Sequence, residues 1–109
     1  MVEALKGQGF GVLTEINIQS IMKEKLRLDY RPYLILGTCN PDFANKALST
    51  EPTIGLMLPC NVILRQNSEN SVEVAAIDPI ASMSAVDNHN LDLIATEVQE
   101  KLKRVIDSL

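Results

Sequence analysis

The sequence contains no tryptophan and only four aromatic residues, Phe10, Tyr30, Tyr33 and Phe43. Hydrophobic residues nevertheless make up 46% of its 109 positions. The core is therefore expected to be aliphatic, built from Ile, Leu, Val and Met. A chain of this length forms one domain, over residues 1–109, and buries enough surface to fold without a disulfide or a metal ion.

Long apolar runs are also absent. No stretch approaches the roughly 18 residues that are needed to cross a bilayer. The first twelve residues lack the basic segment and following apolar segment of a secretory signal. We therefore expect a cytoplasmic protein that does not associate with membranes, with free thiols at its two cysteines.

The chain has no excess of positive charge, because its net charge is −4. Its basic residues gather mainly in segments 23–27 and 101–104, where acidic residues lie between or beside them. Mixed charge of this kind is typical of a solvated helix face. The sequence therefore predicts no nucleic-acid partner.

Hydrophobic periodicity predicts alternating helices and strands. Apolar residues at helical spacing predict a helix after Asn17, another after Asn40-Pro41 and a last one that starts at Asn88 or Asn90. A helix tail over 2–6 and a helical turn over 79–85 complete the helices. Strands are predicted over 10–16, 33–38, 54–65 and 72–77, with a turn over 66–71.

Pro59 interrupts the longest predicted strand, and since proline cannot donate to a ladder we expect an edge or a bulge there. The order of the elements predicts an α+β fold of two layers. Its sheet is expected to be mainly antiparallel, with about four strands and with the helices packed on one face.

Several segments, in the same order along the chain, resemble one known family. They are GFGVLTEINI, KEKL, RPYLILGTCNP, EPTIGLMLPCNV, AAIDP and MSAVDN. From about Glu3 to the C-terminus, the chain resembles the domain of unknown function 302 family. The resemblance implies a small α+β protein, often dimeric, with no established activity.

The chain departs from that family at its start. Members usually carry a further strand and most of a helix before the segment that resembles EALKGQGFGV, and both are missing here. A bare sheet edge favours pairing with another chain. We therefore expect a homo-oligomer, most simply a dimer.

Two Cys-Asn pairs, Cys39-Asn40 and Cys60-Asn61, are candidates for a chemical site. A helix that starts beside Cys39 would favour its thiolate and lower its pKa. If their strands are neighbours, the two thiols would form a redox pair or hold a soft ion such as Cu(I). The alternative is that both cysteines are small buried hydrophobic residues and that Asn40 caps a helix.

No complete catalytic or metal site can be assembled from the remaining residues. A cysteine hydrolase needs a base beside its thiol, and the only histidine, His89, stands in a polar segment before the last helix. One histidine and two cysteines do not complete a zinc site. We expect no catalytic residues, no metal and no cofactor.

The segment DYRPY is a second candidate site. Tyr30, Arg31 and Tyr33 would line a pocket for a small anionic or aromatic ligand, with Arg31 as the partner of an anion. The alternative is a loop whose tyrosines cover the end of the sheet.

Two hypotheses about function follow. The favoured hypothesis is a non-enzymatic module that binds a small ligand or takes part in assembly. The alternative is a thiol-based redox or soft-metal-binding protein that uses Cys39 and Cys60.

Overall fold

Four strands form one antiparallel sheet in the computed structural model, which describes residues 2–83 and 88–109. The strands are β1 (Gly11–Asn17), β2 (Tyr33–Cys39), β3 (Cys60–Ser68) and β4 (Ser71–Ala76). They lie in the sheet in the order of the chain, so each strand pairs with the next. The predicted α+β fold with a four-stranded antiparallel sheet is confirmed.

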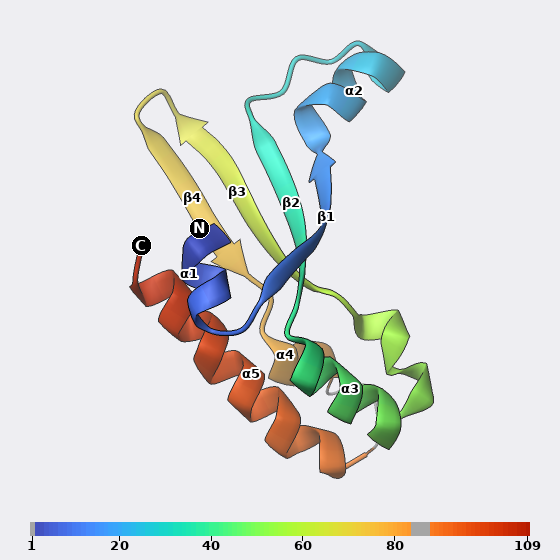
Figure 1. Ribbon diagram of the computed structural model, residues 1–109. Coiled ribbons are helices and arrows are strands. Elements are labelled where there is room, and N and C mark those ends of the chain that lie inside the picture. Colours follow the sequence, from blue (N-terminus) through green and yellow to red (C-terminus); the bar gives the residue numbers. More distant parts are fainter. Residues whose placement is uncertain (1, 84–87) are drawn as a thin grey trace.

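The helices gather mostly at one end of the sheet (Figure 1). They are α1 (Val2–Gly7), α2 (Ile18–Leu26), α3 (Pro41–Thr50), the 3-10 helix η1 (Pro52–Met57), α4 (Pro79–Met83) and α5 (Asn90–Asp107). Figure 1 shows α3, α4 and α5 together at one end, while α2 and the β3–β4 turn project at the other. Among the described residues, no helix has the length and apolarity that a membrane span requires.

The main core lies between the sheet and two helices, α1 and α5. Leu36 of β2 and Val62 of β3 are register partners and face this core. Leu5 of α1 and Leu102 of α5 pack in the same cluster. A second cluster, which joins α3, η1, α4 and α5, consists of Ala47, Ile54, Met83, Leu91 and Ala95.

The predicted strand over 54–65 is wrong in its first half. Residues 52–57 form the 3-10 helix η1, and β3 starts only at Cys60, after a cis Leu58–Pro59 bond. Ile54 is fully buried in the second cluster whereas Leu56 is 86% exposed, so the alternating apolar residues do not follow a strand's two faces. The proline therefore marks the start of the strand rather than its middle.

The helix α2 also departs from the sequence prediction. Its start is as expected, since the Asn17 side chain accepts a hydrogen bond of 3.0 Å from the backbone of Ser20. The apolar stripe on α2, however, contains no buried residue, and Leu26 is 62% exposed. The helix projects past the end of β1, where few neighbours can cover it (Figure 1).

The other helical boundaries agree with the predicted segments. The Asp78 carboxylate accepts a hydrogen bond of 2.9 Å from the backbone of Ile80 and so caps α4. That helix is described as far as Met83, and the last two positions of the predicted turn, 84 and 85, lie outside the described residues. The last helix, α5, begins at Asn90.

Gly37 lies where three strands meet with no room for a side chain. A Cβ atom at this position would clash with the Thr14 hydroxyl of β1 and would come within 2.9 Å of Pro59 Cγ. Glycine therefore allows β1 and the start of β3 to approach β2 closely from both sides.

We predict that Gly37→Ala lowers the free energy of unfolding by about 1–3 kcal/mol, because overpacking forces one of these neighbours to move. Gly55→Ala is the matched control, since no atom lies within 4 Å of the added methyl group. Urea unfolding followed by circular dichroism measures both variants. Equal stability of the two variants would contradict the close packing at Gly37.

Candidate functional site

A cavity of about 350 Å³ lies where the sheet ends and α3 begins. Its walls come from three parts of the fold: Thr38, Cys39 and Cys60 of the sheet, Phe43, Ala44 and Ala47 of α3, and Ile94 and Val98 of α5. Phe10, Leu58 and Met83 also line it. Leu13 and Leu48, which are 66% and 42% exposed, lie on its open side.

The sequence of α3 explains why this space is not filled. Asn40-Pro41 starts the helix directly after β2, so its first turns lie beside the end of the sheet. Ala44 and Ala47, one turn apart, both line the cavity. Their methyl groups are too small to reach the opposite wall, and a hollow remains.

The two cysteines lie on neighbouring strands, and both line this cavity. Cys60 is directly opposite Thr38 in the register of β2 and β3, and Cys39 is the next residue of β2. Cys60 is buried and Cys39 is partly buried. The two residues are therefore close in the sheet, as the sequence analysis considered.

The environment of both thiols disfavours their ionised forms. Burial, and after it the charge of Cys39, raise the pKa of Cys60 to about 11. Burial also raises the pKa of Cys39. The lower Cys39 pKa expected from the start of α3 is therefore wrong, because desolvation by burial raises this pKa instead.

Asn40 links two segments instead of capping α3 with its side chain. It occupies the N-cap position, but its side chain makes no capping hydrogen bond. Its amide nitrogen instead donates to the carbonyl oxygen of Gln8, 3.2 Å away. Gly9, with a φ of 84°, passes so close that a Cβ there would lie 2.9 Å from the Asn40 amide nitrogen. This contact fixes the α1–β1 loop against the start of α3.

Asn61 does not belong to the cavity. It follows Cys60 on β3, so its side chain points to the other face of the sheet, where it is exposed. The second Cys-Asn pair is thus divided between the two faces.

The DYRPY segment is distant from the cysteines. Tyr33 starts β2 and Cys39 ends it, so about 20 Å separates them along the strand. Arg31 is exposed and Tyr33 is partly buried. A broad depression of about 440 Å³ beside α2 includes Tyr30 but neither Arg31 nor Tyr33.

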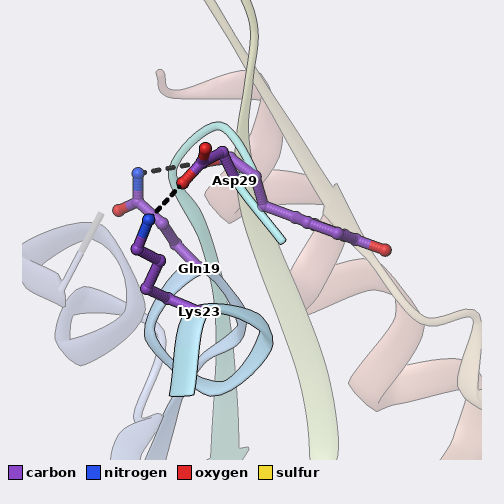
Figure 2. Close-up of polar contacts among 4 residues, drawn as sticks. Gln19, Lys23 and Asp29 are labelled. Carbon is purple, nitrogen blue, oxygen red and sulfur yellow. Dashed lines mark hydrogen bonds and ion pairs between the residues drawn. The ribbon is translucent and has the colours of Figure 1, made fainter. Parts of the chain in front are cut away.

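Polar contacts hold this segment to α2. Figure 2 shows Gln19 and Lys23 pointing from α2 toward the segment around Asp29. Lys23 forms an ion pair of 2.7 Å with Asp29, and the Gln19 amide donates to the carbonyl oxygen of Tyr30, 3.0 Å away. Both side chains of the ion pair are well exposed, so the pair stabilises the fold by less than about 1 kcal/mol.

Two of the polar side chains in the cavity wall have hydrogen-bond partners within the protein. The Thr38 hydroxyl, fully buried, donates to the carbonyl oxygen of Cys60 at 2.7 Å. Asn40 uses its amide on Gln8. In the described part of the chain, no three His, Cys, Asp or Glu side chains form a cluster able to hold a metal ion. The cavity therefore presents an apolar surface suited to an apolar molecule.

Much of the cavity wall comes from the apolar faces of α3 and α5, the helices that apolar spacing predicts after Asn40-Pro41 and at Asn88 or Asn90. Phe43, Ala44 and Ala47 form the expected inward stripe of α3, and Ile94 and Val98 form that of α5. Periodicity identifies the face that a helix turns inward, but it does not tell whether the space in front of that face is filled. The one usable signal was the pair of alanines where larger aliphatic residues would be expected.

The comparisons with known proteins identify a family and a solved relative. The profile of the domain of unknown function DUF302 matches residues 1–109. A crystal structure of an uncharacterized conserved DUF302 protein from Bacillus stearothermophilus is 29% identical, with a TM-score of 0.88. The match covers 97% of this chain and 82% of that one. No curated protein matches the chain.

The profile match over the full length, together with the solved relative of the same fold, shows that the chain belongs to the DUF302 family.

Proposed function

We propose that the protein binds a small apolar molecule, or the apolar part of a larger one, in the cavity between β2, β3, α3 and α5. The observation that carries this proposal is a hollow whose lining is mainly aliphatic and aromatic, and in which Thr38 and Asn40 already donate hydrogen bonds to backbone carbonyl groups. Such a lining makes little contribution to catalysis but favours the transfer of apolar surface out of water.

The size of the cavity supports binding. Ligand pockets of proteins usually measure about 300–1,000 Å³, and this one has about 350 Å³. An apolar cavity of about 150 Å³ accommodates a benzene molecule. By that comparison the cavity accepts an apolar body of up to about fourteen carbon atoms.

We predict that N-phenyl-1-naphthylamine, an uncharged fluorescent probe, binds the protein with a Kd of about 1–100 µM. Ala44→Phe is expected to weaken this binding about tenfold or more, because the added ring occupies the cavity. Fluorescence titration measures both values.

Ser49→Phe is the matched control: it adds the same ring to an exposed position on the same helix, outside the cavity lining. Thermal unfolding checks that both variants fold, and Ala44→Leu replaces Ala44→Phe if the latter does not. Undiminished binding by the folded Ala44 variant, or no saturable binding by the unaltered protein, would overturn the proposal.

The alternative function, thiol-based redox or soft-metal chemistry, is favoured by one observation: Cys39 and Cys60 lie on neighbouring strands beside the same cavity. Burial works against it, because the thiolate is the reactive species and burial raises the pKa of both thiols. We therefore place it second.

A pH series of alkylation separates the two functions. For Cys39→Ser, in which Cys60 is the only thiol, we expect the rate of reaction with iodoacetamide to rise about tenfold per pH unit from pH 7 to 9 without levelling off. The reason is that burial, the larger of the two causes that raise the Cys60 pKa, remains in this variant and keeps the pKa above this range. Mass spectrometry measures the rate, and Cys60→Ser gives the same series for Cys39. A plateau below pH 8 for either thiol would favour the redox function.

Self-association is a second proposed property, and it depends on the bare edge of β1. Within residues 2–83 and 88–109 this strand pairs with β2 only, and residues 13–17 are all exposed. The radius of gyration is 15.2 Å, against about 13 Å for a compact domain of this length. We propose that β1 pairs antiparallel with β1 of a second copy, since such an edge is its own complement under two-fold symmetry.

Light scattering after size-exclusion chromatography tests this proposal. We expect twice the chain mass of 12.0 kDa, and we expect Ile16→Lys on β1 to reduce it to the single mass because lysine blocks edge pairing. Val72→Lys, at an exposed site on the opposite edge strand β4, should leave the dimer intact. A monomer of the unaltered protein at 100 µM would contradict the pairing.

A further inference from the structure

Two lysines stand beside the apolar cavity and share one aromatic ring. The ammonium groups of Lys46 on α3 and Lys101 on α5 lie 5.2 and 5.8 Å from the centroid of the Phe43 ring. Both distances fall within the roughly 6 Å at which a cation is attracted to a ring. A second depression, of about 520 Å³, contains both lysines, and it shares Asn40 and Phe43 with the apolar cavity.

Helical spacing places these lysines next to the cavity. Lys46 follows Phe43 by one turn of α3, and Lys101 follows Val98 by one turn of α5. Residues three apart lie on the same side of a helix, so each lysine continues a face that lines the cavity. Two separate helices thus bring positive charge to the same end of an apolar space.

The two charges lack a partner of opposite sign. In the part of the chain that the structure describes, neither ammonium group forms an ion pair with a carboxylate. Asp42 lines the same depression without making such a pair. Because like charges repel, two ammonium groups on one ring are stabilised by an anion that reaches both.

We infer that the ligand of the cavity is an amphiphilic anion, with an apolar body of about ten carbon atoms inside and a carboxylate or phosphate head group beside Lys46 and Lys101. This inference rests on the proposed binding function and names the class of ligand. The apolar wall supplies affinity for the body, and the lysine pair selects an anionic head over a neutral one.

Displacement of N-phenyl-1-naphthylamine by decanoate, decyl phosphate and decanol tests the inference at low ionic strength. We expect all three to displace the probe. Lys46→Met and Lys101→Met should each weaken binding of the anions about threefold and the double variant more, whereas decanol and the probe should bind as before. Asp42→Asn should tighten anion binding about twofold, because it removes a like charge. The anion that binds more tightly identifies the head group.

Lys103→Met is the matched control, since it removes the same charge from an exposed site on α5 that lies outside both depressions. If the probe and decanol bind but the lysine variants weaken the anions no more than Lys103→Met does, the inference is wrong and the apolar binding function stands. If neither the probe nor decanol binds, the proposed function itself fails.

Discussion

The pairing of Thr38 with Cys60 is the constraint on which the rest of the structure depends. The Thr38 hydroxyl, fully buried, bonds to the backbone carbonyl of the residue opposite, at the last point where β2 and β3 run together. Beyond it, the chain leaves β2 for α3, and it arrives at β3 from η1. A buried carbonyl group without a hydrogen bond would lower the stability of the fold by about 1–3 kcal/mol. The bond therefore fixes both the end of β2 and the start of β3.

That fixed junction determines the character of the cavity. The helix α3 starts three residues after Thr38, and its two alanines line the cavity beside the end of the sheet. The same junction buries Cys60 and partly buries Cys39, so the thiols become part of an apolar wall and their pKa values rise. One local arrangement thus favours binding of an apolar group and disfavours thiolate chemistry.

Elements with strong periodicity and clear ends could be predicted from the sequence. The α5 helix was identified because its apolar stripe matches its burial, whereas the strands of residues 33–38 and 72–77 were identified from their apolar runs, although Val72 is 61% exposed. Segment 54–59 was not, because its apolar residues alternate as in a strand while their burial follows a 3-10 helix. The exposure of α2 was also missed, because a pattern indicates which side of a helix is apolar and not whether anything covers it. The role of Asn40 depends on Gln8, 32 positions away, and local capping rules do not reach that far.

The most direct test of the central claim is to locate a bound apolar molecule by NMR. In protein labelled with ¹³C at its methyl groups, intermolecular nuclear Overhauser effects from N-phenyl-1-naphthylamine should reach Ala44, Ala47 and Ile94, which line the cavity. Ile35 and Ile63, which lie outside the cavity lining, should show none. Contacts to Ile35 and Ile63, or none to the cavity methyl groups at saturating probe, would contradict the account.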